Sequence, residues 1–107
     1  MTAHKLTIDS KVYKELEKII EYGLDNFHED RAYNYYNGFF KVFKHLQNMP
    51  YSGQMYKDDS TIRKYTYEKN HIIIYKINAD INEIRIALIF HARQKIADQY
   101  DYLIAVS

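Results

Sequence analysis

The spacing of apolar residues changes twice along the chain and predicts a strand, two helices and then three more strands. Residues 5–9 alternate apolar and polar positions, as a short strand does. Over residues 10–27 and again over 31–47, apolar residues recur every three or four positions, which is typical of amphipathic helices. The stripes are Tyr13, Leu16, Ile20, Leu24 and Phe27 in the first helix, and Ala32, Tyr36, Phe39, Phe43 and Leu46 in the second.

Three β-type runs follow, at residues 61–67, 71–78 and 83–91, with polar turns between them. Pro50 ends the second helix, and the polar residues 54–60 are expected to form a loop. The predicted fold class is therefore α+β, in the order β-α-α-β-β-β. A strand is followed by an antiparallel helix hairpin, which covers one face of a small antiparallel sheet.

The tail after the last strand keeps a helical spacing of apolar residues, so residues 95–107 are expected to form a short amphipathic helix. A chain of 107 residues suits one domain, here with a core of about residues 5–94. The sequence contains no repeat and no Gly/Ser-rich linker that would divide it.

Alternation along residues 83–91 predicts which face of the sheet each side chain occupies. Ile84, Ile86, Leu88 and Phe90 share one face and are expected to pack on the helices. Arg85 and His91 then lie together on the open face. Arg63, in the first of the three strands, joins them only if the pairing register places it there.

Composition narrows the possible functions. The chain has no cysteine, so disulfides and thiolate metal sites are excluded. No apolar run reaches membrane-spanning length and the N-terminus lacks the apolar stretch of a signal peptide, so a cytoplasmic location is expected. The five histidines show no ligand spacing, and we expect neither a metal nor another cofactor.

The net charge of +1 is low for a protein that binds nucleic acid by itself, because neutralisation of phosphates supplies much of that affinity. Contact with nucleic acid would therefore depend on a local group of cations or on a protein partner. Arg63, Arg85, His91 and Arg93 form one candidate group, with Lys57 and Lys64 near them in the chain. The plain alternative is that these are ordinary solvent-facing strand residues.

An RNA-cleaving site would need an acid or base and cations that hold the phosphate. His91 suits proton transfer near neutral pH, and Arg85 and Arg63 suit bidentate contact with phosphate. Tyr65 suits stacking on an unpaired base. The remaining predicted contact residues are Lys57, Lys64 and Arg93.

The order and spacing of several segments resemble the RelE/ParE superfamily of bacterial toxins. These segments are the stop after the second helix at residues 46–53, Arg63 early in the first hairpin strand, the Ile-Ile-Ile-Tyr-Lys-Ile strand at 72–77, and the Ile-Phe-His-Ala-Arg-Gln ending at 89–94. The resemblance covers about residues 5–94. It implies the toxin of a type II toxin–antitoxin system, which a cognate antitoxin neutralises.

The resemblance implies two possible mechanisms. ParE-like members inhibit DNA gyrase, and the modest charge and the strand ending favour that branch. RelE-like members are ribosome-dependent mRNA endonucleases, for which His91, Arg85 and Arg63 would be the catalytic residues. The chain lacks the dense lysine and arginine set of those nucleases and has no tyrosine directly beside His91. A non-toxic binding module on the same scaffold is the third reading.

Overall fold

A computed structural model describes residues 4–56 and 58–93 of the chain. β1 (Lys5–Ile8) precedes two long helices, α1 (Ser10–Asn26) and α2 (Glu29–Asn48). The predicted C-terminal helix at 95–107 lies outside the described residues. The elements after α2 are the 3₁₀ turn η1 (Pro50–Ser52), β2 (Gln54–Tyr56), β3 (Asp59–Tyr67), β4 (His71–Asn78), the 3₁₀ turn η2 (Ala79–Ile81) and β5 (Glu83–His91).

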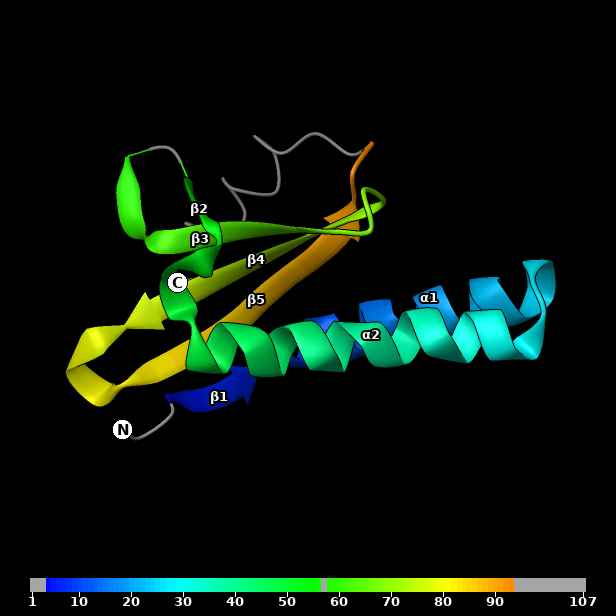
Figure 1. Ribbon diagram of the computed structural model, residues 1–107, viewed down its shortest axis with the longest axis horizontal. Coiled ribbons are helices and arrows are strands. Elements are labelled where there is room, and N and C mark those ends of the chain that lie inside the picture. The colour runs from blue at the N-terminus through cyan, green and yellow to red at the C-terminus, as the bar shows by residue number, and fades with distance from the viewer. Residues whose placement is uncertain (1–3, 57, 94–107) are drawn as a thin grey trace.

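The strands form one mixed sheet in the order β1-β5-β4-β3-β2, and both helices lie on the same face of it (Figure 1). The predicted α+β class and the meander of β3, β4 and β5 are confirmed. The sequence did not predict how the first strand pairs: β1 runs parallel to β5, with Leu6 opposite Ile84, and makes the sheet mixed. The loop expected at 54–60 is partly wrong, since Gln54 pairs with Lys64 and adds β2 to the other edge.

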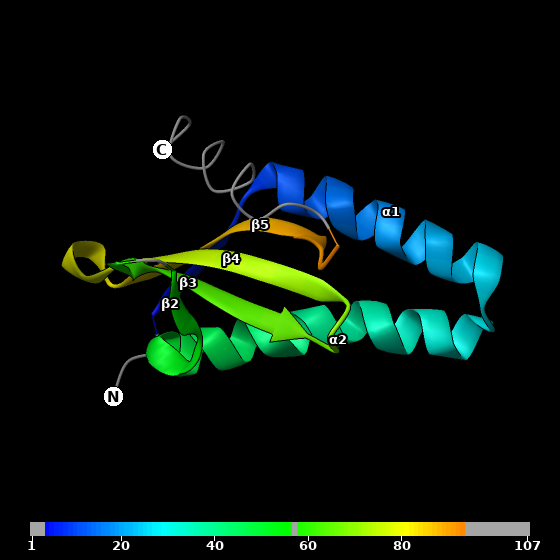
Figure 2. The same ribbon diagram turned by 90° about the horizontal axis from the view of Figure 1, so that it is seen from above.

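Side chains at the helix ends bind the backbone N–H groups that a first turn leaves without partners. Asp9 Oδ1 accepts a hydrogen bond from the Lys11 N–H at 3.2 Å and so begins α1. His28 Nδ1 accepts one from the Asp30 N–H at 3.3 Å and begins α2. The far end of the resulting hairpin projects beyond the ends of the strands (Figure 1, Figure 2). No helix within the described part of the chain is long and apolar enough to cross a membrane.

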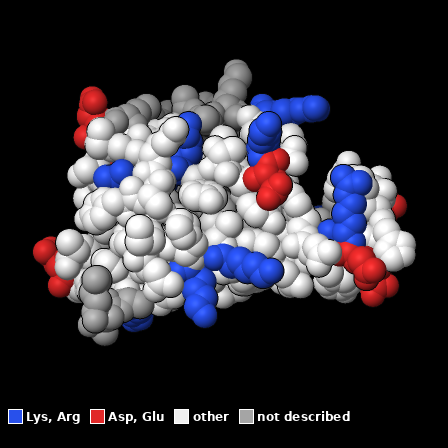
Figure 3. Space-filling view, viewed as in Figure 1, with Lys and Arg blue, Asp and Glu red and all other residues white. Residues whose placement is uncertain are grey.

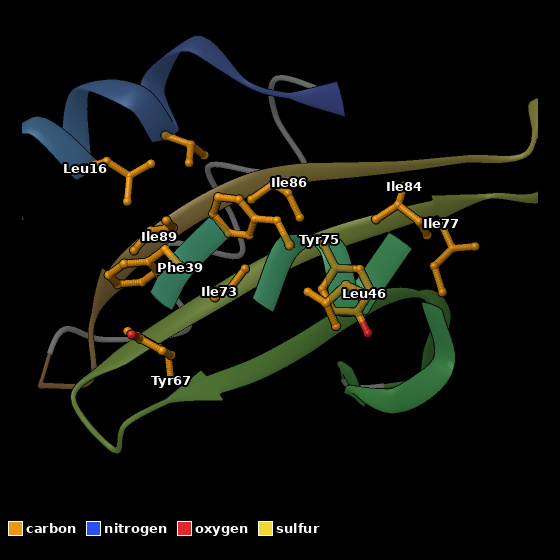
Figure 4. Close-up of a cluster of buried hydrophobic side chains, with 12 residues drawn as sticks. Leu16, Phe39, Leu46, Tyr67, Ile73, Tyr75, Ile77, Ile84, Ile86 and Ile89 are labelled. Carbon is orange, nitrogen blue, oxygen red and sulfur yellow. The ribbon is translucent and has the colours of Figure 1, made fainter. Parts of the chain in front are cut away.

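The main core fills the space between the helices and the sheet (Figure 4). Tyr75 is fully buried in it, where its hydroxyl donates to the Pro50 carbonyl at 2.7 Å and accepts from the Gly53 N–H at 3.0 Å. These two bonds tie η1 to the middle of the sheet. The buried members are Val12, Leu16, Phe39, Phe43, Leu46, Tyr67, Ile73, Tyr75, Ile77, Ile84, Ile86 and Ile89.

The predicted stripe of α2 is largely confirmed, but the stripe of α1 is only partly right. Tyr13, Leu24 and Phe27 are 42–47% exposed, whereas Val12, Leu16 and Gly23 are buried. Leu24 is in the last turn of α1 and Phe27 follows its end, and this end of the helix hairpin projects past the strands (Figure 1), so no strand lies beneath it to bury them. The buried positions of α2 are Ala32, Phe39, Phe43 and Leu46.

Ala87 is an extra residue in β5, and it reverses the side-chain alternation. Ile86 pairs with Tyr75 while Leu88 pairs with Ile74, so Ala87 has no residue of its own opposite it on β4. After this bulge, Ile89 packs with the main core, and Leu88 and Phe90 lie on the opposite face. That face, which we call the open face, carries a second apolar cluster of Tyr56, Ile62, Ile72, Ile74, Ala87, Leu88 and Phe90.

Candidate functional site

Arg85 lies on the open face, as predicted, near the start of β5. Its cross-strand neighbours are Lys76 of β4 and Thr7 of β1. The Arg85 Nη2 atom is 3.5 Å from Asp9 Oδ2, and the Lys11 ammonium is 3.4 Å from the same oxygen. The guanidinium is half-exposed at 51%, so it can still meet an external group.

The charges around Arg85 influence one another. Burial raises the pKa of Asp9, but the Lys11 N–H and ammonium, with Arg85, lower it more, and the net pKa lies below its usual range. Desolvation, followed by repulsion from Arg85, lowers the pKa of Lys76. Asp59 counteracts this shift in part. The open face therefore holds adjacent cations, with Asp9 and Asp59 close to them.

Arg63 points to the other side of the sheet. It pairs with Tyr75, whose side chain is in the main core, so Arg63 faces the helix layer. Its Nη1 donates to the Gly53 carbonyl at 3.1 Å and its Nε donates to the Ser60 carbonyl at 3.0 Å. The guanidinium also lies 5.0 Å from the centre of the Tyr51 ring. Through these contacts, Arg63 holds η1 against β3.

His91 also lies on the helix-facing side, so the prediction that it shares the open face with Arg85 is wrong. The Ala87 bulge is the physical reason, because it shifts the alternation by one residue between the two positions. His91 is exposed and stands opposite His71, with 5.4 Å between the ring centres. Its Nδ1 accepts a hydrogen bond from the Arg93 N–H at 3.2 Å.

His71 and Tyr35 form a polar cluster with His91 that the sequence did not predict. The Tyr35 hydroxyl lies 2.6 Å from His71 Nδ1. Burial, followed by repulsion from His91, lowers the pKa of His71 to about 4. Burial also raises the pKa of Tyr35 to about 12, with a smaller effect from Tyr67. The chain offers only one signal for this cluster: histidines sit at 71 and 91, one beginning and one ending a predicted strand.

The sheet does not bring the three residues proposed for RNA cleavage together. Arg85 is on one face, and Arg63 and His91 are on the other. The partners of Arg63 and His91 on β4 are Tyr75 and His71. Four residues of strand separate those partners, which corresponds to about 13 Å along the strand. A single phosphate cannot contact all three side chains.

The other predicted contact residues are also spread over the molecule. Lys64 is on the open face, because it pairs with Ile74. Tyr65 faces the helices and packs against the main core, with its ring 6.2 Å from that of His45. Arg93 is exposed just after β5. Lys57 lies outside the described residues.

The visible charges are mixed. On the face shown in Figure 3, lysine and arginine side chains lie in small groups among uncharged residues, with Asp and Glu beside some of them. Among residues 4–56 and 58–93, no three His, Asp or Glu side chains gather to hold a metal ion. The chemistry that these side chains offer is contact with a partner through scattered cations and aromatic rings.

The sequence was compared with models of protein families. Residues 6–96 match the family described as the ParE toxin of the type II toxin–antitoxin system parDE. The chain belongs to the ParE toxin family. This ParE toxin is therefore the toxin half of a type II pair, and a cognate antitoxin is its partner.

Solved structures share the fold of this ParE toxin. The chromosomal ParDE system from P. aeruginosa aligns with a TM-score of 0.69 and 18% identity, over 83% of this chain and 96% of that one. A mutant of the E. coli toxin RelE in the free state aligns with a TM-score of 0.69 and 11% identity, over 98% of both chains. A search of curated protein sequences finds no match to this ParE toxin.

Proposed function

We propose that this toxin stops growth by inhibiting DNA gyrase, the mechanism implied for ParE-like toxins, and not by cutting mRNA. One observation carries the proposal: Arg85 lies on the sheet face opposite Arg63 and His91, so the residues that RNA cleavage needs do not converge. Cleavage requires an acid or base within hydrogen-bond reach of the group it protonates or deprotonates, beside cations that hold the same phosphate.

The bonding of the two arginines agrees with this proposal. Nη1 and Nε of Arg63 already donate to backbone carbonyls, which ties the guanidinium to η1 and β3 and leaves only part of its fork to clamp a phosphate. Arg85 is half-exposed and bonded to Asp9 on one side. In the proposed function, Arg85, Lys64 and Lys76 form a contact surface for gyrase on the open face, with Arg93 as a further contact at the end of β5.

Inducible expression of the toxin without its antitoxin tests this function. Gyrase inhibition should slow growth and switch on an SOS reporter, because stalled gyrase leaves broken DNA. RNA cleavage would instead stop translation quickly and leave cut messages at ribosomes. Normal growth at high expression would favour a non-toxic binding module and would contradict the proposal.

A further inference from the structure

A cavity of about 840 Å³ opens where the helix hairpin projects past the sheet. Residues from α1, α2, the turn between β3 and β4, and the ends of β4 and β5 line it. This volume is in the range of pockets that bury a drug-sized group. The open-face cations belong to the proposed gyrase surface, so this cavity is a separate feature on the other side of the sheet.

One wall of the cavity is a fixed aromatic surface with polar edges. Tyr35, His71 and His91 come from α2, β4 and β5 and meet there. The hydrogen bond between Tyr35 and His71 fixes two of the rings. The Phe39 ring packs against both, with its centre 5.5 Å from that of Tyr35 and 5.6 Å from that of His71. A planar group entering the cavity would meet ring surfaces and could form hydrogen bonds with their edges.

The mouth of the cavity carries two exposed aromatic side chains, Tyr22 and Phe27, and the Arg31 guanidinium lies 4.2 Å from the centre of the Phe27 ring. Tyr22 is 63% exposed and Phe27 is 42% exposed, with 6.2 Å between their ring centres. Gly23 and Ala32 lie behind them, and their small side chains let the helices approach closely, since a Cβ on Gly23 would be 3.0 Å from the Ala32 Cβ. Clustered exposed rings beside a cavity mark a site of interaction.

The charges around the cavity indicate which kind of partner fits. Glu15 and Lys18 come from α1, Arg31 from α2 and Glu68 from the turn after β3. Two cations and two anions balance, so a chain of phosphates gains no net attraction here. Aromatic side chains surrounded by a mixed polar rim are instead the usual composition of protein interface centres. The charge balance therefore favours an uncharged ring from a protein over nucleic acid.

We propose that this cavity is the docking site for an aromatic side chain of the cognate antitoxin. The inference rests on the chain being the toxin of a toxin–antitoxin pair, because the antitoxin is the partner that such a pair supplies. The incoming ring packs against Tyr22 and Phe27 at the mouth and against Tyr35 within. Its N–H or O–H group, if it has one, meets the imidazoles of His71 and His91.

Isothermal titration of the purified toxin with the antitoxin encoded beside its gene tests this site. The variants Tyr22→Ser and Phe27→Ser remove exposed rings, so both should keep the fold. Each should weaken antitoxin binding at least about tenfold, as loss of an aromatic anchor does. Tyr13→Ser is the matched control, because Tyr13 is 47% exposed on the same helix but does not line the cavity. It should change the Kd by less than about twofold.

A second measurement does not depend on any variant. In NMR spectra of the wild-type toxin, the ring signals of Tyr35 and His71 should shift when the antitoxin is added. Unchanged ring signals, or equal affinities for the wild type and both cavity variants, would overturn the proposal. Tyr22→Ser should remain as toxic as the wild type in cells without antitoxin, so a failure of this site is distinguishable from a failure of the toxin assignment.

Two other possible occupants of the cavity would give different experimental results. If the cavity held a second copy of the toxin, the toxin alone would sediment as a dimer and Tyr22→Ser as a monomer. If it held nucleic acid, Phe27→Ser would reduce binding of a single-stranded oligonucleotide. Either result would overturn docking of the antitoxin at this site. The proposal expects a toxin whose sedimentation does not respond to Tyr22→Ser and oligonucleotide binding that does not respond to Phe27→Ser.

Discussion

The hydroxyl of Tyr35 lies 2.6 Å from Nδ1 of His71 and joins the middle of α2 to the start of β4. Because burial and then His91 lower the pKa of His71 to about 4, His71 is neutral at physiological pH. The neutral ring has a lone pair that accepts the tyrosine proton, whereas the charged ring has none. Charging His71 therefore reverses the direction of this bond, since the charged ring can only donate to the hydroxyl oxygen, and it places a cation among the aromatic rings of Phe39 and Tyr67.

The stability of the toxin should fall as the pH falls from about 6.5 to about 4. The unfolded chain takes up a proton on His71 near 6.5, while the folded chain resists until about 4. The unfolded state thus binds more protons in this window. The contribution is fully present above the unfolded pKa and is lost as the pH falls through the window. Allowing for partial exposure, we expect a loss on the order of 1–2 kcal/mol, measured by urea unfolding at several pH values.

The variant His71→Gln isolates this effect. In His71→Gln, the free energy of unfolding should depend less on pH between 6.5 and 4.5. In His45→Gln, where the substituted residue is exposed, the dependence should be kept. The lowered pKa values of Asp9 and Asp59 act mainly near and below their usual value of 3.8, so they contribute little between pH 6.5 and 4.5. An unchanged slope in His71→Gln would show that another group is responsible.

Gly38→Ala should destabilise the fold, although alanine is the better helix former. A Cβ at this position of α2 would overlap the hydroxyl of Tyr67, which donates to the Tyr35 carbonyl at 2.9 Å. The forced movement costs about 1–3 kcal/mol, more than the gain of about 1 kcal/mol in helix propensity. Adding Tyr67→Phe removes the hydroxyl oxygen, which is the atom that overlaps most. Thermal unfolding should then show the double variant to be more stable than the sum of the single effects predicts, and strict additivity would contradict the overlap.

A substitution in the turn between β3 and β4 should stabilise the fold. Glu68 and Lys69 have φ values of 50° and 63°, a region that favours glycine and asparagine. The Asn70 N–H donates to the Tyr67 carbonyl at 3.1 Å and closes the turn around them. Lys69→Gly should therefore raise the free energy of unfolding by about 0.5–1 kcal/mol. Lys69→Ala is the control, and it should give no such gain.

Arg85→Ala should weaken inhibition of gyrase about tenfold, because it removes an exposed charge-assisted contact worth roughly 1.4 kcal/mol. Its surface bond to Asp9 contributes little, so the melting temperature should change only slightly. Lys41→Ala removes an exposed charge from α2, which lies on the other side of the sheet, and serves as the control. If the wild type and both variants inhibited gyrase equally, Arg85 would not belong to the contact surface.

The element order could be predicted from the sequence, but the grouping of the candidate residues could not. Local periodicity reveals helices and strands, and it placed Arg85 correctly on the open face. Periodicity does not predict a β-bulge such as the one at Ala87. This single extra residue moves His91 to the helix-facing side of the sheet. Nor does it reveal that β1 runs parallel to β5 or that His71 stands opposite His91, because pairing depends on contacts between distant segments.

The most direct test of the central claim is a supercoiling assay with purified gyrase, the wild-type toxin and His91→Ala. We predict that the wild type inhibits gyrase and that His91→Ala inhibits it within about twofold of the wild type, because the His91 side chain faces away from Arg85, Lys64 and Lys76 and bonds only the backbone N–H of Arg93 among the proposed contact residues. Neither protein should cut mRNA on translating ribosomes. If the wild type leaves gyrase active but cuts ribosome-bound mRNA, and His91→Ala abolishes the cutting, the account is contradicted.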